Sequence, residues 1–128
     1  FAPDAPRVVA VLDWELSTLG HPLSDAAFSC LPWHSTPQMY AGIDGLDRVG
    51  LGIPTQAEYL ERYCAAAERS EGPGRFHHAF SLLRFAVNLD GIAARAKAGN
   101  AAAENAVAVG EMAESFALRA QAVIDGRD

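Results

Sequence analysis

Apolar residues follow two spacings along the chain, and the helical spacing dominates. The run over residues 8–12 is β-branched and is bounded by Pro6 and Asp13, which predicts one short buried strand. A lone strand cannot satisfy its own backbone groups, so this one must pair within a hairpin, with a further segment or with a second copy. The predicted class is therefore mainly α, one domain over residues 1–128 with one short β-strand or hairpin at its start.

Four helices are predicted from capping signals and apolar spacing. The first begins near Pro22, because a first helical turn tolerates proline, and the second follows the capping box Thr55-Gln56-Ala57-Glu58. The predicted ranges are about 22–32, 55–68, 75–98 and 101–124. The apolar residues that recur at helical intervals are Leu23, Ala26, Ala27, Cys30 and Leu31, then Phe76, Phe80, Leu83 and Val87, then Val109, Met112, Phe116 and Val123. Segment 36–54, rich in Gly, Pro and Asp, predicts an ordered loop that could line a site.

Composition limits the class of protein. Of the 128 residues 50% are hydrophobic, but they are dispersed, which predicts a soluble protein rather than a membrane-spanning one. The formal net charge is −6 and the ten Lys and Arg residues are scattered, which disfavours nucleic-acid binding. Cys30 and Cys64 lie far apart and form no CxxC motif, so a reducing compartment is favoured and the cytoplasm is the predicted location.

The candidate chemistry lies directly after the predicted strand, in Asp13-Trp14-Glu15. A carboxylate at the end of a strand is held rigidly and still faces a cleft. Phosphoryl transfer needs such an acid to hold Mg²⁺, which bridges the phosphate oxygens and offsets the charge that develops on them. A turn or helix cap is the usual role of an aspartate at such a position, so spacing alone leaves both interpretations of Asp13 open.

At this point the sequence resembles a known family. Val9-Ala10-Val11-Leu12-Asp13-Trp14-Glu15-Leu16-Ser17-Thr18-Leu19-Gly20, followed by Pro22-Leu23 and Asp25, resembles the aminoglycoside phosphotransferase family, in particular its acyl-CoA-dehydrogenase-associated, choline-kinase-like branch. Further segments similar to that branch are Gly52-Ile53-Pro54-Thr55, Glu58-Tyr59, Arg62-Tyr63-Cys64, Ala79-Phe80-Ser81-Leu82-Leu83-Arg84 and Gly99-Asn100-Ala101. The resemblance covers nearly the whole chain.

The resemblance implies the mostly helical carboxyl-terminal lobe of a protein-kinase-like fold. It implies that Asp13 plays the part of the kinase DFG aspartate and ligates Mg²⁺ on ATP, with possible assistance from Glu15 in metal or substrate binding. It also implies that Asp25 supports the catalytic loop through hydrogen bonds. Family members commonly have Gly-Asp-Pro where this chain has Gly20-His21-Pro22, which leaves the detail of this loop open.

Other parts of the family's active site are not found in the sequence. The His-Gly-Asp catalytic loop and the nucleotide-binding amino-terminal lobe are expected upstream of Phe1. The chain is therefore expected to be the carboxyl-terminal part of an ATP-dependent phosphotransferase that acts on a hydroxyl of a small molecule, without a catalytic base of its own. Mg²⁺ and ATP are the cofactors implied for the intact parent, and the chain alone is expected to be inactive and to bind neither tightly.

Weaker candidates for substrate binding are Trp33 and Asp90. A place in the core is the more common role of a large aromatic residue such as Trp33. Asp90 shares its predicted helix with Arg84 and Arg95, and a solvated helical face would also explain these charged residues. The four histidines lack the spacing of a zinc site.

A second functional class stays open beside the phosphotransferase, namely a non-catalytic helical interaction domain or a degenerate kinase lobe. A hydrolase ranks last because the sequence has no Gly-x-Ser-x-Gly elbow. The uncovered edge of the predicted strand favours pairing with a second copy, so a homo-oligomer is predicted. The sequence does not identify the acceptor.

Overall fold

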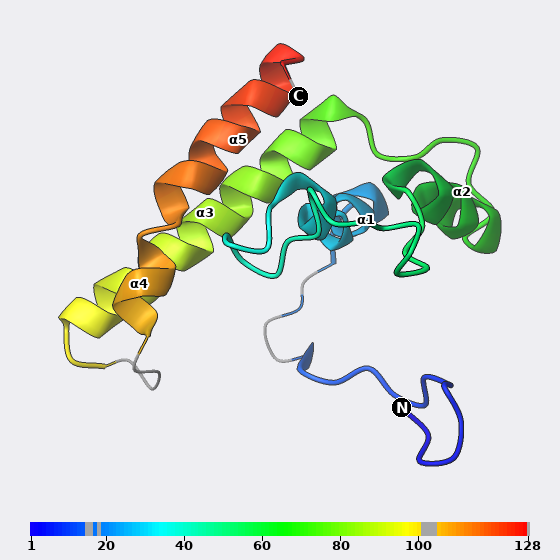
Figure 1. Ribbon diagram of the computed structural model, residues 1–128, viewed down its shortest axis with the longest axis horizontal. Coiled ribbons are helices and arrows are strands. Elements are labelled where there is room, and N and C mark those ends of the chain that lie inside the picture. Colours follow the sequence, from blue (N-terminus) through cyan, green and yellow to red (C-terminus); the bar gives the residue numbers. More distant parts are fainter. Residues whose placement is uncertain (15–16, 18, 101–104, 128) are drawn as a thin grey trace.

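The structure of the chain, a computed structural model, describes residues 1–14, 17, 19–100 and 105–127 (Figure 1). Its elements are α1 (Pro22–Ser29), the 3₁₀ helix η2 (Leu31–His34), α2 (Gln56–Ala66), α3 (Arg75–Lys97), α4 (Ala106–Gly110) and α5 (Ala113–Asp125). The predicted mainly α class is confirmed. Among the helices in the described part of the chain, none combines the length and apolarity that crossing a bilayer demands.

Helix α3 is the centre of the fold. Helix α5 runs antiparallel beside it, α4 lies against its carboxyl-terminal part, and α1 packs on it from another side (Figure 1). The side chains of Leu82, Leu89, Phe116 and Val123 are at most 2% exposed and form the core between α3 and α5. Burial of one such side chain stabilises the fold by about 1.5–3 kcal/mol. Phe116 and Val123 of the predicted apolar stripe are thus buried, whereas Val109 and Met112 are partly buried, lie before α5 and pack against this core.

The large apolar residues of α3 do not form its buried face. Phe76, Phe80, Leu83 and Val87 recur at helical spacing as noted, yet they are 65%, 44%, 49% and 63% exposed. The buried face carries small side chains beside its two leucines, including Ala79, Ala86 and Ala93. Alanine lets neighbouring helices approach closely, so the small face meets α5 and α4 and the large side chains are left outside.

The predicted helix over 101–124 is two helices in the structure, with residues 101–104 outside the described residues. Helix α4 ends at Gly110, and α5 begins at Ala113 after a short turn. Glycine is a poor helix former, and at Gly110 it also permits a close approach to Ala93 of α3. The break lets α4 pack against α3 before the chain turns into α5.

The strand predicted over residues 8–12 is wrong. These residues are exposed and belong to no strand, and the one β-bridge among the described residues joins Ala2 to Ala5. The physical reason is that a strand needs a partner to hydrogen-bond with, and the described part of the chain offers none. Figure 1 shows this amino-terminal segment, in blue, leading away from the helices.

Helix α1 presents its apolar face as predicted. Leu23, Ala26, Ala27, Cys30 and Leu31 are all at most 8% exposed. The helix itself ends at Ser29, earlier than the predicted residue 32, and the chain continues into η2. Burial also raises the pKa of the Cys30 thiol to about 11, so this cysteine behaves as a small apolar residue.

The loop over residues 36–54 packs on η2. The amide of Ile43 donates to the carbonyl of Pro32 at 2.8 Å, and the amide of Asp44 donates to that of Ser35 at 2.9 Å. Trp33 secures the end of the loop, because its Nε1 donates to the carbonyl of Pro54 at 3.1 Å. The loop is therefore ordered, as predicted, but it contributes no lining residue to the cleft described below.

Helix α2 begins with the predicted capping box. The amide of Glu58 donates to the Thr55 hydroxyl at 3.2 Å, and the amide of Thr55 donates to the Glu58 carboxylate at 2.7 Å. No residue of α2 is buried, so the helix depends on this cap and on a few side-chain contacts, among them the ring of Tyr59 against Trp33. The hydrogen bonds from Thr55 lower the pKa of Glu58.

Replacing Glu58 by glutamine is expected to lower the melting temperature at pH 7 and to have little effect at pH 3. A carboxylate whose pKa is lower in the folded than in the unfolded state adds stability above the unfolded value of about 4.3, and this stability is lost as the pH falls through the folded value. Thermal unfolding followed by circular dichroism at both pH values measures the effect. Glu61→Gln on the same helix is the control, and a difference that is the same at both pH values would contradict the role of the cap.

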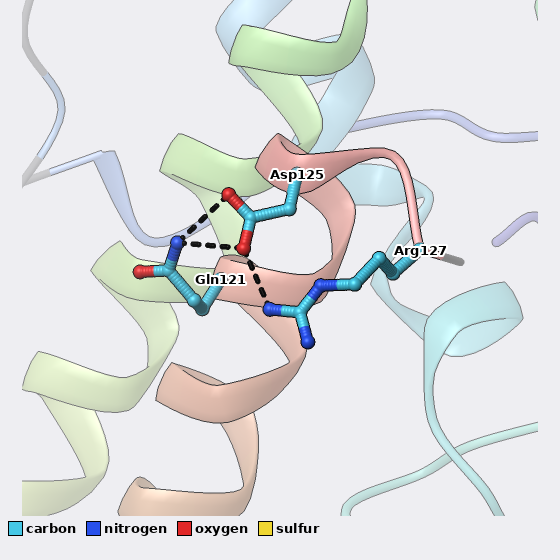
Figure 2. A network of polar contacts seen from close by, with 3 residues as sticks. All are labelled: Gln121, Asp125 and Arg127. Atoms are coloured by element: carbon cyan, nitrogen blue, oxygen red, sulfur yellow. Dashed lines mark hydrogen bonds and ion pairs between the residues drawn. The ribbon is translucent and has the colours of Figure 1, made fainter.

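The carboxyl-terminal end of α5 has a local polar network (Figure 2). Gln121 Nε2 donates to both carboxylate oxygens of Asp125 at 3.0 Å, and Arg127 Nη2 donates to Asp125 Oδ2 at 2.6 Å. The bonds from Gln121, followed by those from Arg127, lower the pKa of Asp125. These hydrogen bonds offset the unfavourable interaction of the Asp125 carboxylate with the negative end of the helix dipole. Gly126, whose φ angle is 72°, ends the helix.

Candidate functional site

A cleft of about 650 Å³ lies where the amino-terminal segment meets the helices. Its lining comes from three parts of the chain, namely segment 11–14 with Ser17, the start of α1, and α3. Gly20 and His21, directly before α1, and Ser24 and Asp25 of α1 line one side, and Phe80 and Arg84 are the lining residues of α3. The cleft thus collects two carboxylates, one guanidinium and one imidazole beside aromatic side chains, which is the composition expected of a binding site for a polar ligand.

Asp13 lines this cleft and is exposed. A turn holds it in place of the predicted strand, because Trp14 Nε1 donates to the carbonyl of Val11 at 2.7 Å and the amide of Ser17 donates to that of Trp14 at 2.9 Å. The φ angle of Asp13 is 70°, a left-handed conformation that aspartate and asparagine tolerate better than most residues. The carboxylate is neither packed into the core nor used as a helix cap in the described structure.

Asp25 lies in the first turn of α1, where a carboxylate is favoured by the helix dipole. Its side chain is 84% exposed, and Oδ1 lies 3.9 Å from Nη1 of Arg84 on α3. This contact joins α1 to α3 at the edge of the cleft. The role implied by the family resemblance, support of a catalytic loop, stays a prediction.

Arg84 and His21 are cleft residues that sequence reasoning did not single out as site residues. The Arg84 guanidinium lies over the ring of Phe28 with 4.8 Å between its carbon and the ring centroid. The ring of His21 stacks on that of His77, with 5.5 Å between centroids. Arg84 is the last residue of a family-like run in the sequence, and this was the available signal. Nothing in the local pattern shows which face of α3 meets the cleft.

The remaining predicted site residues are not brought to this cleft. Glu15 lies outside the described residues. Trp33 is half-buried, and its indole N–H donates a hydrogen bond to the Pro54 carbonyl. Asp90 is exposed on α3 and does not line the cleft. Trp33 therefore has a packing role in the structure, and its predicted substrate contact stays untested, as does that of Asp90.

The donors present fit a magnesium site of the kind found in kinases. Mg²⁺ in such sites is held by one or two carboxylates, and water and substrate phosphates supply its other ligands. Asp13 and Asp25 line the same cleft, which matches that donor set. The described residues hold no group of three or more His, Cys, Asp or Glu side chains placed to bind a metal ion, so they do not form a site made wholly of protein ligands.

Known proteins are similar to this chain in structure and in sequence. A crystal structure of a protein from Ralstonia eutropha JMP134, provisionally named an aminoglycoside phosphotransferase, matches with a TM-score of 0.88 at 41% sequence identity, covering 98% of this chain and 39% of that chain. Mouse acyl-CoA dehydrogenase family member 10 is 40% identical over 120 residues, which cover 91% of this chain and 11% of that protein. Human acyl-CoA dehydrogenase family member 11 is 38% identical over 108 residues, covering 82% of this chain and 14% of that protein. The chain matches no protein-family model.

The fold and the strong structural match define the class of protein, a helical carboxyl-terminal lobe of the protein-kinase-like fold. Over nearly its whole length the chain is similar to the Ralstonia protein, and it is also similar to part of acyl-CoA dehydrogenase family member 10, which confirms the predicted resemblance. It spans 39% of the Ralstonia chain and 11% to 14% of the two dehydrogenase family members.

Proposed function

We propose that this chain is the carboxyl-terminal part of an ATP-dependent phosphotransferase that phosphorylates a hydroxyl group of a small molecule. One observation carries the proposal. The Asp-Trp-Glu aspartate, Asp13, presents an exposed carboxylate to a cleft that Asp25 also lines. Similarity to the Ralstonia protein supports the reaction class.

In this proposal Asp13 holds the magnesium ion that accompanies ATP, and Asp25 contributes negative charge nearby. When bound, Mg²⁺ neutralises charge on the phosphoryl group that is transferred. The turn between Val11 and Ser17 fixes the position of Asp13, and the hydrogen bond of the Trp14 indole to Val11 closes that turn. Glu15 stays a prediction as a second metal ligand.

The 128 residues contain no His-Gly-Asp sequence, and in this proposal the group that receives the proton of the acceptor hydroxyl is not one of them. Proton removal and metal binding act together in phosphoryl transfer, and Asp13 alone cannot position ATP. We therefore propose that the chain alone turns over no ATP and binds Mg²⁺ and ATP weakly.

A chimera tests the proposal. The segment of the Ralstonia protein that matches this chain is replaced by this chain, and ATP consumption is followed with a panel of small hydroxyl compounds. We expect consumption that requires Mg²⁺ in the chimera, and none in the 128-residue chain alone. A folded chimera that consumes no ATP, while the intact Ralstonia protein does, would contradict the proposal.

That outcome would favour the second candidate function, a non-catalytic helical interaction domain. One observation speaks for it, namely the exposed apolar side chains of α3 and of residues 8–12. Exposed apolar surface of this kind recruits partners, and a second copy of the chain is the predicted one. The homo-oligomer stays a proposal.

A further inference from the structure

We propose that Arg84 is the oxyanion-binding residue of the cleft, and that it takes a phosphate of the nucleotide or an anionic group of the acceptor. The biological meaning of this inference rests on the proposed phosphotransferase function. Its physical basis is the geometry of one guanidinium, and it can be tested without any reaction.

Arg84 is held in place and is still reachable from the cleft. It lies on α3, where its neighbours Leu82 and Ala86 are 0% and 4% exposed, so the helix backbone at this point is anchored in the core. The guanidinium rests on the face of Phe28 of α1, a cation–π contact that orients it. The side chain nevertheless remains 48% exposed and lines the cleft.

The hydrogen-bonding capacity of this guanidinium is not used by the described residues. Its nearest carboxylate oxygen, Oδ1 of Asp25, lies 3.9 Å away, which is an ion pair but too long for a hydrogen bond. No side-chain hydrogen bond among the described residues has Arg84 as donor. A guanidinium carries N–H donors in a planar fork that matches phosphate and carboxylate oxygens, so an oxyanion would satisfy donors that Asp25 does not.

The charged residues that line the cleft indicate that the ligand of Arg84 is an anion. Asp13 and Asp25 suit a divalent cation, whereas Arg84, the one guanidinium among the lining residues, suits an anion whether or not that cation is bound. A phosphate bound between a metal ion and a cationic side chain is an arrangement that stabilises the charge developing in phosphoryl transfer. A polycationic acceptor placed beside Arg84 would instead meet repulsion.

Titration of the ¹⁵N-labelled 128-residue chain with inorganic phosphate in metal-free buffer tests the inference by NMR. We expect saturable shifts of the Arg84 side-chain N–H and of cleft amides, and a loss of affinity of about fivefold or more in Arg84→Gln. Arg95→Gln, which removes the same charge from an exposed residue of α3 outside the cleft lining, should change affinity less than about twofold. Asp25→Asn should tighten binding, because it removes the competing carboxylate.

Separate arms identify the source of the anion. ADP that shifts the Arg84 signal and binds more tightly than phosphate indicates the nucleotide, whereas phosphate binding with no response to ADP indicates the acceptor. Both outcomes support an oxyanion role. If Arg84→Gln fails to fold by circular dichroism, Arg84→Lys keeps the charge without the fork and should still weaken phosphate binding.

Two results would overturn the inference. One is an Arg84 signal that does not respond to phosphate up to tens of millimolar, and the other is an affinity that is the same in the wild type and in the folded Arg84 variant. Because the buffer holds no metal ion, a failure here leaves the metal role of Asp13 intact. Loss of that metal role would in turn leave phosphate binding by Arg84 unchanged.

Discussion

Gly110→Ala is expected to destabilise the chain by about 2–3 kcal/mol and to lower its melting temperature by roughly 8–12 °C. A Cβ at Gly110 would lie 2.2 Å from Cβ of Ala93 and 3.0 Å from its Cα. Neither atom belongs to a flexible side chain, so the backbones of α4 and α3 would have to separate. Chemical and thermal unfolding followed by circular dichroism measure the loss.

Gly91→Ala is the matched control on α3. The nearest atom to a Cβ at Gly91 is Nη1 of Arg95 at 3.6 Å, which is an ordinary contact with a movable side chain. Because alanine favours the helix over glycine by about 1 kcal/mol, this variant should be stabilised. Equal stabilisation of both variants would mean that α4 does not lie against α3 as described.

Asp13→Asn is expected to lower ATP consumption by the Ralstonia chimera at least about 100-fold, because a metal ion in such sites contributes several kcal/mol to stabilising the transition state. Asparagine has nearly the same shape and tolerates the left-handed conformation of residue 13, so the turn should persist while the charge is lost. Asp4→Asn, which removes one charge from the exposed amino-terminal segment, is the control and should retain activity. An Asp13 variant as active as its parent would remove the aspartate from the metal site.

The sequence predicted those parts of the fold that depend on interactions between residues close together in the chain. The capping box at Thr55 and Glu58 forms because its two hydrogen bonds join residues three apart in the chain. The apolar face of α1 is buried because it has no competing apolar face. On α3, by contrast, alanines and large apolar residues both recur at helical spacing, and the pattern does not tell which set is buried. The choice depends on how closely α5 and α4 approach, which is tertiary information.

Non-local pairing also explains what sequence reasoning missed at the candidate site. Residues 8–12 have the composition of a strand but no partner among the described residues, so Asp13 reaches its cleft by a turn instead. The contact between Asp25 and Arg84 joins residues far apart in the chain, so the sequence around either residue does not predict it. Motif similarity found the acidic residues, whereas the basic residue opposite them needed the structure.

Binding of Mn²⁺, which takes the same oxygen ligands as Mg²⁺, to the ¹⁵N-labelled chain tests most directly whether Asp13 holds a metal ion. Substoichiometric Mn²⁺ should broaden the amide signals of Leu12, Asp13 and Asp25 before all others, and Asp13→Asn should abolish this broadening. Identical broadening in both proteins, or broadening confined to other acidic residues such as Glu68 and Glu71, would contradict a metal site at Asp13.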